Sequence, residues 1–405
     1  MAPVLLLILP IVSIFVAFAR PRLTVLGVGR EPHAALNVER CTAVQDLEAC
    51  EDAWVHHSSG TAYLACSSLE MRAHWMPALE KLDGLSLPEE STDRVRLFDF
   101  KSQTHREMML SGLPHEARGV WLHGMDAIAH PDDPSLLVLF LVSHRPPADR
   151  SRAHETGADS VVEIFETRPG SSSSHVAKWV ATARHEAIRT PNNIVATGPR
   201  SFYVSNDHHR KVHWTRKLEL AYGFGSDVQH CDVSSGVTEC ITAADNIAFP
   251  NGLAKGPNDL LYVASTMHAE VQVWEMQSDK TLQPFSLIPL ERPIDNLHVS
   301  PTTGAVFAAT IPRFFDFAAA APTVSDPYRP ASPGRRSMVE VWQIANETDP
   351  EQVFLGRKYR KEVALADPKG EVVSAVTSAA PWRDQLLLTG FFTPEAVVCQ
   401  MPSTL

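Results

Sequence analysis

The chain has 405 residues and a formal net charge of −11, because 47 Asp and Glu outnumber 36 Lys and Arg. This charge argues against a protein that binds nucleic acid by neutralising phosphates. Hydrophobic residues make up 44% and charged residues 20% of the chain, which is usual for globular proteins, so the composition excludes global disorder. The 30 prolines fall between short apolar runs, where they would interrupt helices, and they argue against a long helical bundle.

The first 22 residues have the composition of a targeting segment. Met1–Ala19 contains no charged side chain, and Arg20 and Arg22 follow it. Nineteen helical residues span about 28 Å, close to the roughly 30 Å core of a bilayer. Ala17-Phe18-Ala19 resembles the small-x-small site of a cleaved signal peptide. We therefore predict an N-terminal hydrophobic helix, with residues 1–22 acting either as a signal peptide or as a signal anchor.

Either form of this segment places the rest of the chain in the secretory pathway. The protein is expected to be secreted, or to be anchored with its main domain on the lumenal or extracellular side. The sequon Asn346-Glu347-Thr348 makes Asn346 a candidate glycosylation site in that compartment. The six cysteines, an even number, fit an oxidising environment. No CxxC pair occurs in the sequence, so a thiolate zinc site is not expected.

One pattern recurs six times after this segment: a polar residue, a short β-prone run, a turn, and an apolar run that ends in small residues. Each apolar run has the length, branching and aromatic content of a buried or half-buried strand. The turns are rich in residues that favour tight turns. Six hairpins of one design predict the radial repetition of small antiparallel sheets. The apolar runs occupy residues 60–68, 135–144, 198–207, 258–266, 304–310 and 384–392.

The predicted fold is all-β, a six-bladed β-propeller over residues 40–401. The pattern leaves one alternative open, an irregular β-sandwich or two-domain β protein whose hairpins only resemble one another. Residues 315–338 are rich in Pro, Ala and Arg and show no periodicity. They are predicted to form a surface loop inserted into the repeat.

Polar residues precede the paired strands at one phase of the repeat. The innermost strand of every propeller blade lines a central channel, so residues at equivalent positions converge. Carboxylate and amide oxygens suit calcium, which takes six to eight oxygens at about 2.3–2.6 Å. Singly, these residues have ordinary explanations as turns and caps, but together and without a cation they would leave several buried polar groups unpaired. They are Glu51, Asp52, His123, Asn192, Asn193, Asn251, Asp295 and Asn296.

Several motifs, in this order, resemble the serum paraoxonase/arylesterase family of calcium-dependent arylesterases and lactonases. The resemblance extends from about Arg40 to Met401. Its most specific segments are CTAVQDLEACED, WLHGMD, NNIVATGPRSFYVSNDHH, FPNGLA and PIDNLHVSPTTG. It implies a six-bladed propeller with two calcium ions in its central tunnel, one catalytic and one structural.

The resemblance also implies a role for each polar residue. Asp52 and Asn193 would hold the structural calcium ion, helped by backbone carbonyls near Ala53 and Met125. Members of the family usually carry Asp where this chain has Asn193, so one negative charge is missing from that site. The catalytic calcium ion would be held by Glu51, Asn192, Asn251, Asp295 and Asn296.

His123 in WLHG and His144 in LVSH match the histidine pair of the family. The resemblance implies that His123 is the base that activates water and that His144 assists it. From the residues alone, a buried core histidine is the favoured interpretation of His123, and the resemblance reverses that preference. Glu51 and Asp295 are rival candidates for base or nucleophile. The expected substrate is a small-molecule ester or lactone whose carbonyl is polarised by calcium and attacked by water. No GxSxG motif is present, so an acyl-serine route lacks support.

The resemblance pairs Cys41 with Cys399, a disulfide that would fasten the two ends of the ring. Cys231 and Cys240 flank a turn and are candidates for a hairpin bridge. Cys50 with Cys66 is a further candidate pair. Both of these pairs could instead be buried free thiols.

Residues 210–222 are predicted to form an amphipathic helix. Trp214, Leu218, Ala221 and Tyr222 would share one face, with basic side chains elsewhere. Such a helix, like residues 1–19, could contact a membrane or lipid surface. The alternative is a helix that packs over the rim of the propeller.

Two other functions stay open. One is a non-catalytic, calcium-stabilised propeller that binds a partner through its loops. The other is a gluconolactonase-like or strictosidine-synthase-like propeller enzyme, against which the histidine pair and the terminal cysteines argue.

Overall fold

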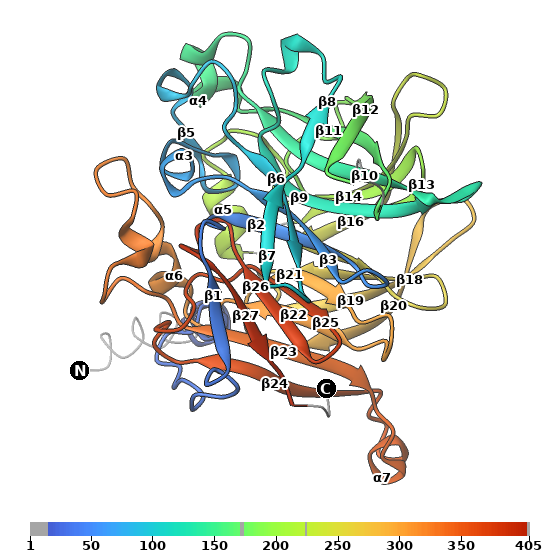
Figure 1. The fold of residues 1–405 in the computed structure, drawn as a ribbon. Coiled ribbons are helices and arrows are strands. Elements are labelled where there is room, and N and C mark those ends of the chain that lie inside the picture. Colours follow the sequence, from blue (N-terminus) through green and yellow to red (C-terminus); the bar gives the residue numbers. More distant parts are fainter. Residues whose placement is uncertain (1–14, 171–173, 223–224, 403–405) are drawn as a thin grey trace.

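The computed structural model describes residues 15–170, 174–222 and 225–402. Six small sheets surround a central axis, and each sheet contributes one innermost strand (Figure 1). The six inner strands contact one another in chain order, and the last of them also contacts the first, so the ring is closed. The predicted all-β, six-bladed propeller is therefore confirmed. The inner strands are β2 (Cys50–His56), β9 (Leu122–His130), β13 (Pro191–Gly198), β17 (Pro250–Lys255), β21 (Ile294–Val299) and β25 (Ser378–Trp382).

Each of the first three sheets continues outward from its inner strand through antiparallel hairpins. The second sheet carries a short parallel edge strand, β8 (Met109–Ser111). The outer strands of the first three sheets are β3 (Thr61–Cys66), β6 (Arg94–Asp99) and β7 (Thr104–Glu107); β10 (Asp133–Arg145), β11 (Asp159–Thr167) and β12 (Val176–Ala183); and β14 (Ser201–Asn206), β15 (Gly225–Asp232) and β16 (Glu239–Ala248).

The sixth sheet joins the two ends of the chain, because its outermost strand comes from the N-terminal side. In that sheet β1 (Cys41–Val44) pairs with β27 (Ala396–Gln400), and Cys41 lies opposite Cys399. The remaining outer strands are β18 (Leu260–Ser265), β19 (Glu270–Met276) and β20 (Leu282–Pro289) in the fourth sheet; β22 (Val306–Thr310), β23 (Val339–Asn346) and β24 (Tyr359–Asp367) in the fifth; and β26 (Gln385–Thr389) in the sixth.

Three disulfides staple paired strands. Cys41–Cys399 closes the ring, Cys50–Cys66 links β2 to β3, and Cys231–Cys240 links β15 to β16. All three predicted pairings are confirmed, and none of the six cysteines is free. Disulfides of this kind fit an oxidising compartment. Asn346 ends β23 with an exposed side chain, so its sequon is accessible, and glycosylation stays a prediction.

The core lies between neighbouring sheets, and β10 shows how the sequence builds it. Successive side chains of a strand point to opposite faces. Phe140 and Val142 therefore pack toward the third sheet, against Phe202, whereas Leu139 and Leu141 pack toward the first. An uninterrupted apolar run is expected for a strand that is buried on both faces.

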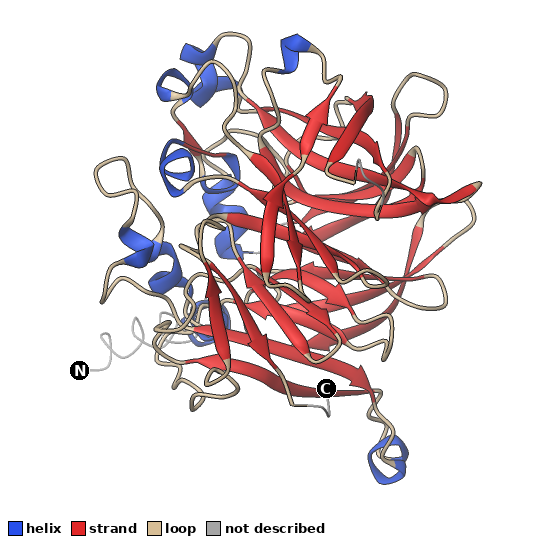
Figure 2. Ribbon diagram, viewed as in Figure 1, coloured by secondary structure: helices blue, strands red, loops and turns tan. Residues whose placement is uncertain are grey.

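Short helices gather on one face of the ring, and α7 lies apart from them (Figure 2). A two-stranded hairpin, β4 (Trp75–Met76) and β5 (Lys81–Leu82), also interrupts the first blade. The helices are the π-helix Phe15–Ala19, α2 (Arg20–Val25), α3 (Leu69–His74), α4 (Ala153–Thr156), α5 (Arg216–Tyr222), α6 (Phe314–Ala320) and α7 (Pro350–Phe354), with single 3-10 turns at Pro77–Leu79, Gly84–Ser86, His115–Ala117, Arg150–Arg152 and Arg329–Ala331.

Two of the expected segments differ from their prediction. Residues 315–338 were expected to be a surface loop, but they begin within helix α6. Phe317 and Ala320 of that helix are buried, and Phe317 packs against Phe391 and Phe392. Phe314 and Phe317, three residues apart, thus lie on one face of α6. The Pro-rich remainder of the segment hides this helical periodicity in the sequence.

The predicted helix over residues 210–222 is limited to α5, which begins at Arg216. The Arg216 guanidinium is buried and donates to backbone carbonyls, among them those of Lys211 and Pro77. These bonds hold residues 210–215 in a non-helical approach to α5. Trp214 is 70% exposed, as expected for a surface-facing aromatic residue, whereas the side chains of Ala221 and Tyr222 lie outside the described structure.

Most of the predicted N-terminal hydrophobic helix, residues 1–14, lies outside the described residues. The described part continues from the π-helix into α2. Within residues 15–170, 174–222 and 225–402, no helix has the length and apolar character needed to cross a bilayer.

Candidate active site in the tunnel

The predicted ligand residues lie where the inner strands depart from regular pairing. In β2, β9, β13, β17 and β21, one extra residue is inserted relative to the neighbouring strand, at the same phase of each blade. Such bulges re-aim side chains and free backbone groups from the ladder. The inserted segments contain Glu51, His123-Gly124, Asn192-Asn193, Asn251-Gly252 and Asp295-Asn296.

Two glycines allow these bulges to approach one another. A Cβ atom on Gly124 would lie 2.2 Å from the carbonyl oxygen of Asn192, and a Cβ atom on Gly252 would lie 2.6 Å from that of Asp295. Any larger residue would push adjacent inner strands apart. The bulges can therefore converge on the axis only with glycine at these two positions.

Five of the predicted residues line one cavity, hereafter the catalytic cavity. They are Glu51, His123, Asn192, Asn251 and Asp295, and all five are buried. Three oxygen atoms in this set, Oε2 of Glu51 and Oδ1 of Asn192 and of Asn251, have no hydrogen-bond partner within the described residues. Buried oxygens of this kind are normally paired, so the cavity offers electron pairs that suit a hard cation.

The charged forms of the two carboxylates in the cavity are unfavourable when no cation is near. Burial, followed by the charges of Asp52 and Asp295, raises the pKa of Glu51 well above its ordinary value. Burial also raises the pKa of Asp295 to about 8. A divalent cation would offset both desolvation and mutual repulsion. The two carboxylates together balance its charge.

The unpartnered carboxylate and amide atoms of the catalytic cavity, among the described residues, are all oxygens. The described residues contain no cluster of three or more His, Cys, Asp or Glu arranged to hold a metal ion. The free oxygens come instead from one carboxylate and two amides, and no thiolate accompanies them. Oxygen-only sites with amide ligands are typical of calcium.

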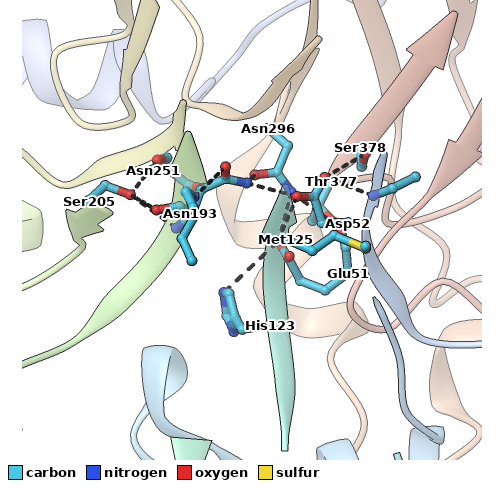
Figure 3. Close-up of polar contacts among 12 residues, drawn as sticks. Glu51, Asp52, His123, Met125, Asn193, Ser205, Asn251, Asn296, Thr377 and Ser378 are labelled. Carbon is cyan, nitrogen blue, oxygen red and sulfur yellow. Dashed lines mark hydrogen bonds and ion pairs between the residues drawn. The ribbon is translucent and has the colours of Figure 1, made fainter. Parts of the chain in front are cut away.

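Asn296 links the catalytic cavity to a second group of residues (Figure 3). Its Nδ2 donates to Oε1 of Glu51 at 2.8 Å, and its Oδ1 accepts from Nδ2 of Asn193 at 2.8 Å. Asn193 and Asp52 line a separate cavity of about 380 Å³. That cavity is also lined by residues at the C-terminal ends of the inner strands, such as His57 and Lys255. Six of the seven predicted ligands thus divide between the two cavities, and Asn296 lies between them.

His123 and His144 are buried and pack edge to face, with ring centroids 5.0 Å apart. Nε2 of His123 lies 3.9 Å from Oε1 of Glu51, while Nδ1 of His144 is 2.9 Å from Oγ of Ser160. Burial, followed by the neighbouring His144, lowers the pKa of His123 well below its ordinary value. Burial likewise lowers the pKa of His144, to about 4. Both rings are therefore neutral near pH 7, the form in which a histidine accepts a proton.

Two charged residues near this pair were missed by sequence reasoning. Arg72 of α3 is buried, and Nε and Nη2 of its guanidinium have no partner in the described structure. Asp207 follows β14, and its Oδ1 lies 2.8 Å from Nδ1 of His208. Burial alone would raise the pKa of Asp207, but the charge of His208 and its hydrogen bond outweigh burial, so the pKa is lowered.

The sequence contains a signal for Asp207 but not for Arg72. Asp207 is the last residue of the run 198–207, just as His144 is the last residue of the run 135–144 in the preceding repeat. The repeat therefore brings Asp207 to the same end of the tunnel. Arg72 lies in a stretch of mixed character, where no periodicity indicates which way its side chain points.

Comparisons with known proteins identify a family. The model of the family described as Arylesterase matches residues 76–400. Serum paraoxonase/arylesterase 1 of Rattus norvegicus is 25% identical over 285 residues, covering 69% of this chain and 68% of the relative. Serum paraoxonase/arylesterase 1 of Mus musculus is 24% identical over 367 residues, covering 89% and 86%. Serum paraoxonase/arylesterase 2 of Gallus gallus is 28% identical over 285 residues, covering 69% and 68%.

Among solved structures, the fold is similar to that of the major Malassezia sympodialis allergen Mala s 1. The TM-score is 0.50 at 10% sequence identity, with 92% of this chain and 98% of the allergen covered. At that identity the similarity concerns the fold alone.

Proposed function

Because the chain belongs to the arylesterase family, we propose that it is a calcium-dependent hydrolase of carboxylic esters and lactones. One observation carries this proposal: three buried oxygens that have no partner among the described residues converge with a neutral histidine on one cavity. Ester hydrolysis follows from the family, whereas calcium dependence and lactone hydrolysis are inferred from the donor set and from the resemblance of the motifs.

Glu51, Asn192, Asn251 and Asp295 would hold the ion, with Asn296 positioned beside Glu51. A bound calcium ion would supply electrostatic stabilisation of the negative charge that develops on the substrate carbonyl oxygen. The side-chain oxygens of the two carboxylates and two amides are already in place around the ion site before the substrate arrives. Such preorganisation lowers the reorganisation needed in the transition state.

His123 is proposed to remove the proton from the attacking water. Its Nε2 is the ring nitrogen near Glu51, and a hydrogen on Nδ1 would leave Nε2 free to accept. The negative charge of Glu51, 3.9 Å away, stabilises the imidazolium that forms. His144 packs edge to face against His123 and is itself held by Ser160, so we assign it a positioning role.

Mainly apolar side chains form the rest of the catalytic cavity and would bind the acyl or aryl part of a substrate. The space left among them is small, about 60 Å³, so side chains at the mouth must move to admit a substrate. Leu79, 38% exposed, is one such side chain, and α6 supplies others. The apolar residues include Leu79, Phe249, Ile311, Phe314, Phe317 and Phe391.

We further propose that the protein acts in the secretory pathway or outside the cell. The three disulfides and the accessible sequon at Asn346 support this location. Contact with a membrane through residues 1–19 follows from their composition. Residues 210–222 support such contact less, because Arg216 is occupied by backbone carbonyls.

A panel of phenyl esters and lactones tests the proposal directly. Purified protein is assayed before chelation, after chelation, and after calcium is added back. We expect hydrolysis to be lost on chelation and restored by calcium, with no recovery after magnesium. Full activity in chelator would contradict calcium dependence, and no hydrolysis under any condition would favour a non-catalytic propeller.

A further inference from the structure

The two ends of the tunnel differ in how their buried oxygens are satisfied. In the catalytic cavity, Glu51, Asn192 and Asn251 each leave one oxygen without a partner among the described residues. Asp52, the next residue along β2, is equally buried and leaves none. A carboxylate accepts about four hydrogen bonds, and all four positions on Asp52 are taken.

Four donors surround Asp52, two on each oxygen. The backbone N–H of Ala53 and the Ser378 hydroxyl donate to Oδ1, at 2.8 and 3.3 Å. The backbone N–H of Met125 and the Asn193 amide donate to Oδ2, at 3.1 and 3.0 Å. The resemblance implied that Ala53 and Met125 would turn carbonyl oxygens toward an ion. Here the groups that they turn toward Asp52 are N–H groups.

The orientation of the Asn193 amide is determined by three partners. Its Oδ1 accepts from the backbone N–H of Ile194 at 2.8 Å. Its two amide hydrogens go to Oδ2 of Asp52 and Oδ1 of Asn296. Turning the amide over would bring its NH₂ group against the N–H of Ile194 and its oxygen against two acceptors. The group that Asn193 presents to Asp52 is therefore its NH₂ group, and the side chain could present its oxygen there only by losing all three bonds.

His298 adds a further N–H group beside Asp52. Because the Ser378 hydroxyl donates to Asp52, its oxygen is free to accept from Nε2 of His298, which lies 2.7 Å away. The same Nε2 is 3.6 Å from Oδ1 of Asp52. The cavity side of Asp52 is thus covered by N–H and O–H groups, which repel a cation.

We propose that the Asn193 amide takes the place of a second cation, so that the tunnel binds one calcium ion per chain instead of two. The hydrogen bond from Asn193 satisfies Asp52 in the way that an ion would satisfy a pair of carboxylates. The expected structural calcium ion therefore does not fit the residues present. The inference depends on the proposed function for the one remaining ion, and the experiment separates the two.

The number of bound ions is the test. The full-length protein is dialysed to equilibrium against calcium, and calcium per chain is measured by inductively coupled plasma mass spectrometry. We expect one ion for the native protein and two for Asn193→Asp, because the new carboxylate removes a donor and supplies acceptor oxygens beside Asp52. Asn258→Asp adds the same charge at an exposed turn and should leave the number at one.

A second variant covers the case in which Asn193→Asp does not fold. Asp52→Asn should leave one ion bound, because Asp52 holds none, whereas loss of an ion in this variant would overturn the inference. Two ions in the native protein, or one in folded Asn193→Asp, would also overturn it. No ion in the native protein but one in Asn193→Asp would contradict the proposed catalytic ion, and it would still support the replacement of the second ion by the Asn193 amide. No ion in either would contradict both.

Discussion

Nε2 of His123 lies 3.9 Å from Oε1 of Glu51, and the other oxygen of that carboxylate, Oε2, has no partner in the described part of the chain. One carboxyl group thus faces the candidate base with one oxygen and offers the other to a cation. Loss of either side chain is therefore expected to affect catalysis, but only loss of the carboxylate should affect binding of calcium.

Replacing His123 by Gln should lower kcat/KM for phenyl esters and lactones by about 10²–10⁴-fold, the usual contribution of a general base. Bound calcium, measured by equilibrium dialysis, should be unchanged because His123 is not a proposed ligand. His154→Gln changes a histidine whose side chain is 71% exposed, and it should retain full activity. Unchanged turnover in His123→Gln would eliminate its role as base and turn attention to Glu51 or Asp295.

Replacing Asp295 by Asn should have opposite effects on stability with and without calcium. Without the ion, the variant removes a buried carboxylate whose pKa burial raises to about 8, so its melting temperature should be equal to or higher than that of the native protein. With saturating calcium, the variant should melt lower, because one ligand charge is lost. Asp326→Asn, at an exposed position, is the matched control. Identical calcium-induced shifts in all three proteins would mean that Asp295 does not bind the ion.

The stability of the protein should fall on acidification partly through His144. Burial, offset in part by Asp207, lowers the pKa of His144 to about 4, against about 6.5 in the unfolded chain. The unfolded state therefore binds more protons between these values. The associated stability is fully present above pH 6.5 and is lost as the pH falls toward 4, by up to about 3 kcal/mol.

His144→Gln should flatten this part of the profile. Urea unfolding of both proteins at pH 7, 5.5 and 4.5 measures the effect, and the difference in unfolding free energy between them should shrink as the pH falls. A constant difference across the three pH values would mean that His144 keeps an ordinary pKa in the folded protein.

The three disulfides should contribute to stability in the order of the loops that they close. Cys41–Cys399 spans 358 residues, Cys50–Cys66 spans 16 and Cys231–Cys240 spans 9. The chain-entropy model gives upper bounds of about 6, 3 and 2.5 kcal/mol, respectively. Unfolding of the three paired Cys→Ser variants in urea checks the order. The smallest loss for Cys41/Cys399 would show that strand pairing alone holds the ring closed.

The sequence predicts the blades and the converging residues for one physical reason, which is that a repeat places equivalent positions on a common axis. Glu51, Asn192, Asn251 and Asp295 could be grouped although they lie far apart along the chain. The same reasoning could not separate Asp52 from Glu51, because adjacent residues in a bulge face different ends of the tunnel.

The features that could not be predicted depend on contacts between blades. The orientation of the Asn193 amide is set by Asp52 from the first blade and Asn296 from the fifth. Arg72 and the buried face of α6 belong to insertions that do not follow the repeat. Sequence periodicity says nothing about such segments, because their positions depend on the tertiary surface on which they pack.

The central claim is that these oxygens surround a calcium ion beside His123, and anomalous diffraction tests it most directly. Crystals grown in calcium should show one strong anomalous peak in the catalytic cavity. Oxygens of Glu51, Asn192, Asn251 and Asp295 should lie about 2.3–2.6 Å from it. An active, calcium-saturated enzyme whose anomalous density lies elsewhere, or is absent from this cavity, would contradict the account.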